Sequence, residues 1–464
     1  MTGGTVLQLL LDHLFVVIGF ALAVFGLGHV VRQRRSAAAT TLWLLVIVLF
    51  PYLGVPLYLM FGGRKTRRAA ADRQKLDLPA RGTIPDEEAT APDRLLRSFG
   101  VPGATAGNGL RLCGTGEETY ACLMENIAGA RESIDVLTFI FANDEVGRAV
   151  LEALARRAAQ GIKVRVLVDG VGSWGTRRRF FRALRRAGGR VEFFTPVIHR
   201  PFRGRSNLRN HRKLVIFDDR RVIAGGTNVA SEYIGPVPRP DRWRDLAFFL
   251  EGPAVAHYAE IFRSDWHFAA GEPVPPRLDT AVAPAGTGVV QVVPSGPDAA
   301  GDPLYDALLS ALFSARRRFW CVTPYFVPDE TMATAFLVAA HRGIDLRLLL
   351  PARSNHRMAD LARGTYLREI QAAGGRILLY TGGMVHAKAA LMDDDLAVIG
   401  SANLDMRSFF LNYECAVFSY DAASVAATEE WIRHLAAGCR EGVGEVGPFR
   451  DTIEGIARMV GPLL

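Results

Sequence analysis

The sequence predicts an α/β protein with two pseudo-symmetric halves, each a mixed sheet flanked by helices, behind an N-terminal hairpin of two transmembrane helices. Three observations predict this fold. One short motif occurs twice, strand-like and helix-like segments alternate in the same order before both copies, and the first 61 residues are more apolar than the rest. We expect two transmembrane helices over 1–63, a charged linker over 64–103, a first half over 104–290 and a second half over 291–464.

Two apolar segments predict the transmembrane hairpin. Residues 14–31 are apolar except for His29, and residues 42–61 carry no charge. At about 1.5 Å per residue, each approaches the ~30 Å of a hydrocarbon core. A cleaved signal peptide is the alternative, because residues 37–39 are alanines, but no basic residue precedes the first segment and a second one follows. Basic residues lie between and after the segments, and by the positive-inside rule they favour a cytoplasmic large domain.

Composition limits the partners and cofactors. The net charge of +8 favours an anionic partner, which is a phospholipid, a nucleic acid or a phosphorylated substrate. The five cysteines have no paired spacing, so we expect neither a disulfide scaffold nor a zinc site. We therefore expect no cofactor and no metal.

The two halves repeat the same order of segments. A β-rich apolar segment occupies 134–141 in the first half and 319–327 in the second, and a buried strand follows over 162–168 and 344–350. A helix-like stretch then ends at Ala-Gly-Gly-Arg in both halves, since glycine stops a helix. Strands that alternate with helices predict mixed or largely parallel sheets.

The repeated motif is H-x-K-x4-D, followed by an asparagine 17 residues after each histidine. Arginine is the usual cation of this chain, so lysine at two of only five places indicates a need for a compact ammonium. We assign the motif residues to catalysis and the asparagines to a supporting role. They are His211, Lys213, Asp218 and Asn228 in the first half, and His386, Lys388, Asp393 and Asn403 in the second.

The motif predicts chemistry at a phosphate group. Histidine and lysine two apart on a strand share one face, so two such faces related by pseudo-symmetry would surround one small anion. One imidazole can attack phosphorus and the other can protonate the leaving oxygen, while lysine and asparagine donors stabilise the developing charge. Adjacent lysines oppose a metal cation, which disfavours a metal site.

Each catalytic histidine needs a carboxylate that fixes its other ring nitrogen. Asp245 and Glu414 are each followed two residues later by alanine and four later by phenylalanine. We expect Asp245 to hold His211 and Glu414 to hold His386. The motif aspartates lie at strand ends that enter turns, so for them a structural role is favoured over direct chemistry.

These motifs resemble the phospholipase D superfamily. The segments Thr323–Asp329, Gly400–Ser408 and Asn207–Lys213 further resemble its bacterial cardiolipin synthase branch, although Gly226 stands where that family commonly has serine. The resemblance implies transfer of a phosphatidyl group from one phosphatidylglycerol to another through a phosphohistidine, giving cardiolipin and glycerol without a metal. It also implies a multi-pass protein of the bacterial cell membrane that works on anionic lipid and not on nucleic acid.

Several alternatives stay open. A phospholipase D hydrolase would use water in place of the second lipid, and a nuclease of the superfamily would not need two membrane spans. A non-catalytic lipid-binding scaffold would not need both motifs. We assign His211 as nucleophile and His386 as acid and then base, but near-symmetry allows the reverse, and the oligomeric state is undetermined.

Three other segments are weaker candidates. A basic segment before the first motif could recognise a second anionic lipid, a basic helical stretch could lie on a membrane, and a C-terminal apolar stripe predicts a docked helix. The residues are Arg200, Arg203, Arg205 and Arg209; Arg177, Arg178, Arg179, Arg182, Arg185 and Arg186; and Ile453, Ile456, Val460 and Leu463.

Overall fold

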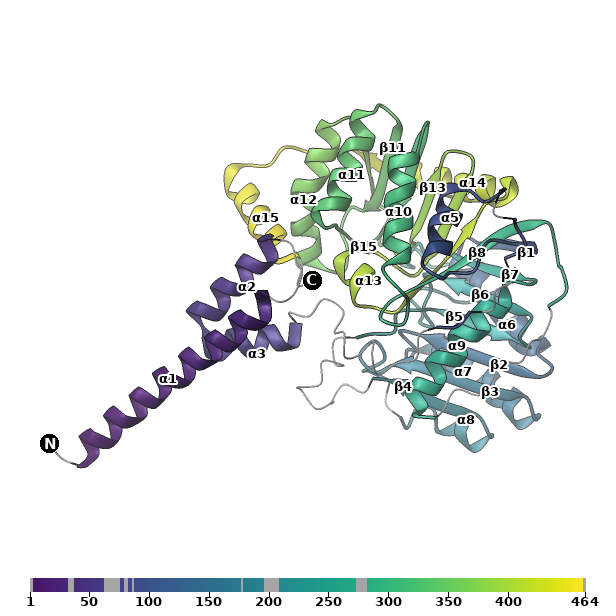
Figure 1. Cartoon of the computed structure of the whole chain (residues 1–464). Helices are drawn as coiled ribbons and strands as arrows, with labels where there is room; N and C mark the ends of the chain where they lie inside the picture. The colour runs from purple at the N-terminus through teal and green to yellow at the C-terminus, as the bar shows by residue number, and fades with distance from the viewer. Residues whose placement is uncertain are drawn as a thin grey trace. The chain divides into compact units, whose positions relative to one another are not determined.

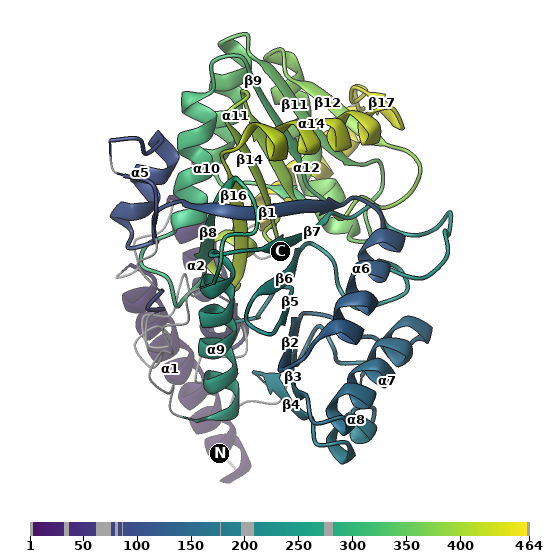
Figure 2. The same ribbon diagram turned by 90° about the vertical axis from the view of Figure 1, so that its right-hand side faces the viewer.

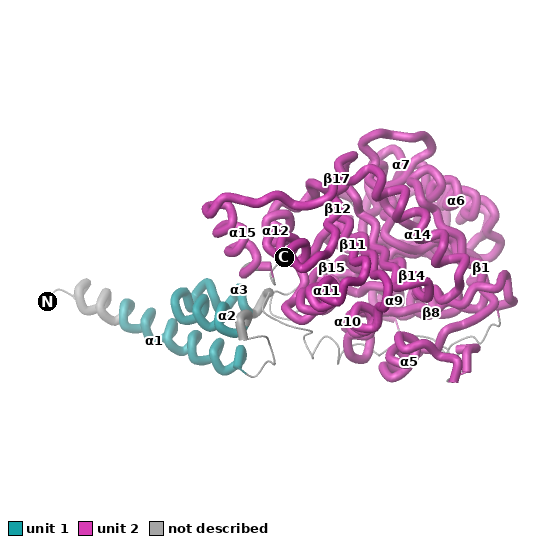
Figure 3. The backbone as a smooth tube through the Cα atoms, turned by 90° about the horizontal axis from the view of Figure 1, so that it is seen from above, with its two compact units in different colours: residues 1–72, 198–208, 463 teal, residues 73–197, 209–462, 464 magenta. Residues whose placement is uncertain are grey.

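The computed structural model describes two compact units (Figure 3). The first comprises Met1–Asp72 and Ile198–Leu208, and the second comprises Arg73–Val197 and Arg209–Pro462. The described residues are 3–31, 37–61, 76–78, 82–85, 87–176, 178–195, 208–272 and 282–461.

The first unit contains α1 (Gly3–Val31), α2 (Ala37–Leu49) and α3 (Pro51–Phe61). Among the described residues, one helical segment, Leu11–Val31, is long and apolar enough to cross a membrane. The second apolar segment was expected to form one helix over 42–61, but it is divided between α2 and α3. Pro51 begins α3, and a Cβ at Gly54 would lie 2.5 Å from the Val46 carbonyl oxygen, so the chain turns sharply where glycine allows close approach.

The second unit is built on one sheet of 15 strands (Figure 1). In sheet order the strands are β17 (Cys439–Glu441), β12 (Arg376–Tyr380), β11 (Asp345–Pro351), β9 (Arg318–Val322), β13 (Ala389–Met392), β14 (Leu396–Gly400), β16 (Glu414–Ser419), β8 (Gly288–Ser295), β1 (Thr105–Cys113), β7 (Ala247–Glu251), β6 (Arg221–Gly225), β5 (Leu214–Phe217), β2 (Ser133–Thr138), β3 (Lys163–Asp169) and β4 (Arg190–Phe194). A separate parallel pair joins β10 (Phe326–Val327) and β15 (Leu404–Asp405).

The strand order confirms two pseudo-symmetric α/β halves. From the central pair outward, the first half runs β1-β7-β6-β5-β2-β3-β4 and the second runs β8-β16-β14-β13-β9-β11-β12. The last three strands are parallel in each half, whereas the inner pairs are antiparallel, so both sheets are mixed. The expected boundary between the halves, at 290/291, lies inside β8.

Helices cover both faces of this sheet. In the first half, α6 and α7 pack together on one side and α9 lies against β4 and β5 on the other (Figure 2). Buried apolar residues of the two halves form separate cores between these helices and the strands. The helices are α5 (Ala91–Ser98), α6 (Gly116–Gly129), α7 (Glu145–Ala159), α8 (Arg182–Arg186), α9 (Val255–Ala270), α10 (Pro303–Ser314), α11 (Glu330–His341), α12 (Arg357–Ala372), α13 (Met406–Phe410), α14 (Ala422–Ala436) and α15 (Pro448–Val460).

Part of the expected charged linker, 64–103, is folded. The Thr90 side chain caps α5, which buries Leu96 in the core of the second half. The Asp93 carboxylate accepts a hydrogen bond from the Gln291 side chain at 3.0 Å. The sequence analysis did not predict α5, because the helix has only eight residues and its few apolar residues lie among charged ones.

The strand registers bring both motifs to one edge of the sheet. Leu214, at the start of β5, pairs with Leu137 near the carboxyl end of β2, and Ala389 pairs with Val322 at the carboxyl end of β9. Each motif was expected on a strand, but histidine and lysine lie just before β5 and β13. We call this edge, at the carboxyl ends of β2, β3, β9 and β11, the motif edge.

Candidate active site

Main-chain hydrogen bonds tie each motif to the other half. The His211 amide donates to the Tyr413 carbonyl at 2.9 Å, and the Tyr413 amide donates to the Arg209 carbonyl at 2.9 Å. On the other side, the His386 amide donates to the Arg244 carbonyl at 2.7 Å. Tyr413 and Arg244 each precede a candidate carboxylate, so these bridges carry that carboxylate to the opposite histidine.

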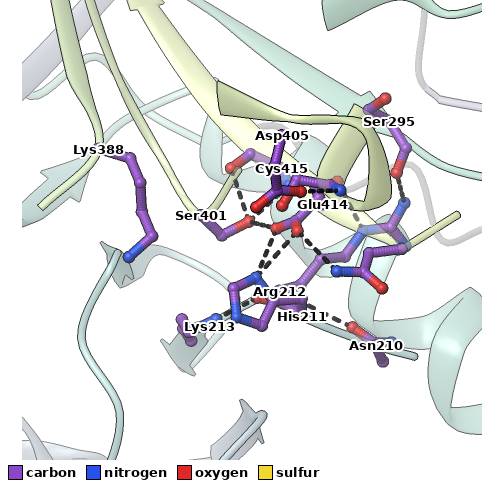
Figure 4. Close-up of polar contacts among 12 residues, drawn as sticks. Asn210, His211, Arg212, Lys213, Ser295, Lys388, Ser401, Asp405, Glu414 and Cys415 are labelled. Carbon is purple, nitrogen blue, oxygen red and sulfur yellow. Dashed lines mark hydrogen bonds and ion pairs between the residues drawn. The ribbon is translucent and has the colours of Figure 1, made fainter. Parts of the chain in front are cut away.

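The carboxylates therefore pair across the halves. His211 Nδ1 lies 2.9 Å from Glu414 Oε1, and His386 Nδ1 lies 2.7 Å from Asp245 Oδ2 (the first pair is shown in Figure 4). The expected pairing, Asp245 with His211 and Glu414 with His386, is wrong, although the local pattern identified the correct two acids. The expectation assumed that each acid serves the histidine of its own half. Main-chain hydrogen bonds between the halves instead bring Glu414 to His211 and Asp245 to His386.

The two carboxylates have different surroundings. Glu414 also accepts hydrogen bonds from Ser401 Oγ at 2.5 Å and from Asn412 Nδ2 at 3.3 Å. Gly226 stands at the position that corresponds to Ser401, and a Cβ on it would lie 2.2 Å from Asp245 Oδ1. The first half thus lacks the hydroxyl donor, and the Asp245 carboxylate occupies the space that a side chain would need.

The two motif lysines are buried beside the histidines. Lys213 Nζ donates to the His211 carbonyl at 2.6 Å, and Lys388 Nζ lies 2.8 Å from His386 Nδ1 and 3.1 Å from its Nε2. Figure 4 shows Lys388 on the opposite side of His211 from Asn210. Burial lowers the pKa of Lys213 to about 7 and that of Lys388 to about 8, although Glu414 and Asp245 oppose the shift.

Burial favours the neutral form of both histidines. Burial lowers the pKa of His386 to about 3, and Lys388 adds to this effect while Asp245 opposes it. Burial also lowers the pKa of His211, against the attraction of Glu414. A neutral imidazole that donates its Nδ1 proton to a carboxylate has a lone pair on Nε2, which is the form that a nucleophile or base requires.

The motif aspartates hold turns and do not contact the histidines. The Asp218 carboxylate accepts hydrogen bonds from the amides of residues 131–133, and the Asp393 carboxylate accepts them from the amides of residues 316–318. Both residues have positive φ, of 55° and 49°. Their assignment to catalysis is therefore corrected to the structural role that their position at strand ends favoured.

The two asparagines differ in their contacts. Asn228 Oδ1 accepts a hydrogen bond from the Ile140 amide at 3.0 Å, which fixes the turn after β2. Asn403 Oδ1 is buried and has no hydrogen-bond partner among the described residues. Of the pair, Asn403 therefore keeps an unused acceptor.

Arg212, between the motif histidine and lysine, was missed by the sequence analysis. Its guanidinium is fully buried and forms ion pairs with Asp265 at 3.0 Å and Asp298 at 2.9 Å, and its Nε donates to the Glu414 carbonyl at 3.0 Å. The only signal was a charged residue where the second motif has Ala387, on the face that points away from the site. A guanidinium buried at this position requires buried carboxylates that compensate its charge.

The basic segment expected to recognise a second lipid is only partly described. Arg209 is buried, pairs with Asp169 at 3.5 Å and donates to the Thr195 carbonyl, so its charge is already compensated. Arg200, Arg203 and Arg205 lie outside the described residues. Among the described residues, no group of three or more histidine, cysteine, aspartate or glutamate side chains is placed to hold a metal ion.

Comparison with known proteins identifies the family of this site. A family model described as "Cardiolipin synthase, PLD-like domain" matches residues 123–266 and 308–436, and one described as "Phospholipase_D-nuclease N-terminal" matches residues 21–63. The chain is 33% identical to the major cardiolipin synthase ClsA of Bacillus subtilis over 89% of each chain. It is 32% identical to cardiolipin synthase 1 of Bacillus anthracis over 97% of this chain and 94% of that one.

A solved structure shares the fold. The phosphatidylserine synthase of Haemophilus influenzae superposes with a TM-score of 0.62 at 15% identity, covering 81% of this chain and all of that one.

Proposed function

Because this chain belongs to the cardiolipin synthase family of phospholipase D-like proteins, we propose that it transfers a phosphatidyl group from one phosphatidylglycerol to the hydroxyl of another, giving cardiolipin and glycerol. The observation that carries the proposal is the pair of crossed dyads, His211 with Glu414 and His386 with Asp245. Two oriented imidazoles beside two lysines are the groups that a two-step phosphoryl transfer needs.

In the first step, His211 Nε2 attacks phosphorus and the bond to the glycerol oxygen breaks. Glu414 accepts the hydrogen bond from Nδ1 and stabilises the positive charge that develops on the ring. His386 gives its proton to the departing glycerol oxygen. Binding of the phosphodiester anion between the lysines offsets their positive field and raises the pKa of His386, so that it can carry this proton.

In the second step, His386 takes the proton from the hydroxyl of the second phosphatidylglycerol. That oxygen attacks phosphorus, the bond to His211 breaks, and both imidazoles return to their starting forms. Lys213 and Lys388 stabilise the negative charge on the phosphoryl oxygens in both steps.

We keep His211 as the proposed nucleophile and His386 as the proposed acid and then base, and near-symmetry allows the reverse. Lys388 Nζ lies 2.8 Å from His386 Nδ1 and 3.1 Å from its Nε2. Lys213 Nζ instead donates to the His211 carbonyl at 2.6 Å, so the two histidine rings differ in their contact with a lysine.

We also propose how the chain lies in the membrane. The segment Leu11–Val31 forms one span, and α2 with α3, which carry no charge, form a second, broken span. Basic residues after the second span favour a cytoplasmic catalytic unit, and the lipid substrates favour a bacterial cell membrane over any nucleic-acid partner.

One incubation tests the proposal. The purified full chain is given phosphatidylglycerol alone, and the lipid and aqueous products are identified. Equal amounts of cardiolipin and glycerol are expected. Phosphatidic acid in place of cardiolipin would show that the enzyme is a hydrolase. If phosphatidylglycerol stays intact, both the synthase and the hydrolase assignments are wrong.

A further inference from the structure

The C-terminal helix α15 exposes an apolar face. Phe449, Ile453, Ile456 and Met459 recur every three or four residues and so lie on one side of the helix. Phe449 is 81% exposed, Ile456 59% and Met459 64%. We expected Ile453, Ile456, Val460 and Leu463 to dock the helix. Leu463 and the Val460 side chain lie outside the described residues, and Ile453 and Ile456 are exposed, so these two do not dock it.

The opposite face of α15 packs on α12 (Figure 1). Glu454 is 1% exposed and pairs with Arg368 at 2.7 Å, and Arg458 pairs with Glu369 at 2.7 Å. Ala457 is buried in a small cluster at the start of α12. Charged pairs and one alanine therefore hold the helix, and the apolar stripe is left without a partner among the described residues.

The stripe reaches the motif edge. α12 begins directly after the loop that follows the carboxyl end of β11, and Ala457 packs with Ala359 in its first turn. Met358 is an exposed apolar residue in the same turn, and Arg353 and Arg357 are exposed beside it. Apolar and cationic side chains thus lie together at the end of the strands where the histidines lie.

The first half has a matching surface after β3, the strand that corresponds to β11. Val171 and Trp174 are exposed in the loop that follows it, Trp174 by 64%. Residues 171–190 contain seven arginines and no acidic residue. The exposed arginines whose side chains the structure describes between β3 and β4 are Arg178, Arg179, Arg182, Arg185 and Arg186. Arg190 is not part of this surface, because it begins β4 at the opposite edge of the sheet and pairs with Glu272.

We propose that these two surfaces form a rim that contacts an anionic lipid bilayer. The rim consists of Val171, Trp174, Met358 and the α15 stripe, with the arginines that flank them. Apolar side chains enter the boundary between headgroups and acyl chains, and arginines bind the anionic headgroups. A second copy of the chain is the weaker occupant, because a symmetric contact through residues 171–190 would set arginines against arginines.

The rim would turn the motif edge toward the source of lipid. Contact between the rim and a bilayer requires only the exposed side chains and their charge. A test of this contact is therefore independent of which reaction the enzyme catalyses.

Fluorescence quenching of the full chain in bilayer discs tests the rim. An environment-sensitive label is placed at Ile456→Cys or Trp174→Cys in a Cys439→Ser background, since the other four cysteines are buried. The discs contain phosphatidylglycerol with brominated acyl chains. Matched controls carry the label at Val338→Cys or Phe313→Cys, which are exposed apolar positions near the amino ends of β11 and β9, away from the motif edge.

We expect quenching several-fold stronger at 456 and 174 than at the two control positions. Quenching at 174 should fall as salt rises, because screening weakens the arginine contacts. Equal quenching at rim and control positions would overturn the proposal. Energy transfer between labels at 456 on two chains without quenching by bromine would also overturn it and assign the face to a second copy. If the 456 label prevents folding, Met459→Cys supplies an independent position on the same stripe.

Discussion

Replacing Arg212 with alanine should destabilise the protein strongly. The arginine is fully buried, and its guanidinium neutralises two carboxylates, Asp265 and Asp298, that are also fully buried. Breaking one buried ion pair by removing a partner costs ~3–5 kcal/mol. Because one guanidinium serves two acids here, we expect a loss near the upper end, about 5 kcal/mol. In thermal unfolding of the full chain in detergent, this corresponds to a midpoint lower by roughly 10 °C.

The same change should slow the reaction. Arg212 Nε donates to the Glu414 carbonyl, so its loss removes one of the bonds that place the carboxylate on His211. Small misplacements of a catalytic group cost on the order of 10- to 100-fold in rate. Activity measured well below the unfolding midpoint separates this loss from unfolding.

A triple variant provides the control. Changing Asp265 and Asp298 to asparagine together with Arg212→Ala removes the two buried charges that lose their guanidinium partner in the single variant. Most of the stability should return, as an uncharged residue, Ala387, already occupies the matching position in the second motif. An unchanged unfolding midpoint in the single variant, or no recovery in the triple, would refute the reasoning that loss of the guanidinium charge beside these buried carboxylates is the cause.

Three further predictions concern the site itself. His211→Ala and His386→Ala should each abolish turnover with the unfolding midpoint kept. After incubation with phosphate-labelled phosphatidylglycerol and denaturation in alkaline detergent, which preserves a phosphorus–nitrogen bond, label should remain on histidine in the parent chain and be absent in His211→Ala; label retained in that variant would contradict the assigned nucleophile. Gly226→Ser should lower kcat severely because its Cβ displaces the adjacent carboxylate. Ser401→Ala removes the hydrogen bond to the charged Glu414 carboxylate, worth about 1.5–3 kcal/mol or roughly 10- to 150-fold in rate, and the bond that the hydroxyl accepts from the Cys415 amide; a smaller loss in Gly226→Ser than in Ser401→Ala would contradict this asymmetry. The pKa of Lys213 is lowered to about 7, so above that pH the free enzyme loses a positive charge that binds phosphate, and kcat/KM should fall as pH rises; a profile that rises through this range would contradict the electrostatic role.

Much of the site could be predicted because its signals are local along the chain. A histidine and a lysine two residues apart share a face of an extended segment, so His211 and Lys213 were placed together without knowledge of the fold. The acids were found through a short pattern that recurs in both halves. The turn role of the motif aspartates followed from their position at strand ends, and their hydrogen bonds to residues 131–133 and 316–318 confirm it.

The sequence analysis did not predict that the second apolar segment is divided into two helices. Hydropathy measures how apolar 42–61 is, but it does not register that Pro51 begins a new helix and that Gly54 lets the chain pack against Val46. Similarly, α5 was hidden within charged residues because the burial of Leu96 depends on a core formed by distant elements.

By itself, the sequence determined the two α/β halves, the motif residues, the two supporting acids and the apolar N-terminus. Periodicity and spacing carry these features, and both are set by backbone geometry over a few residues. Only the tertiary structure decided which acid serves which histidine, where the charge of Arg212 is neutralised and which face of α15 is left exposed. His211 and Glu414 are 203 residues apart, and they meet because main-chain bonds between the halves are formed only when the whole sheet is assembled.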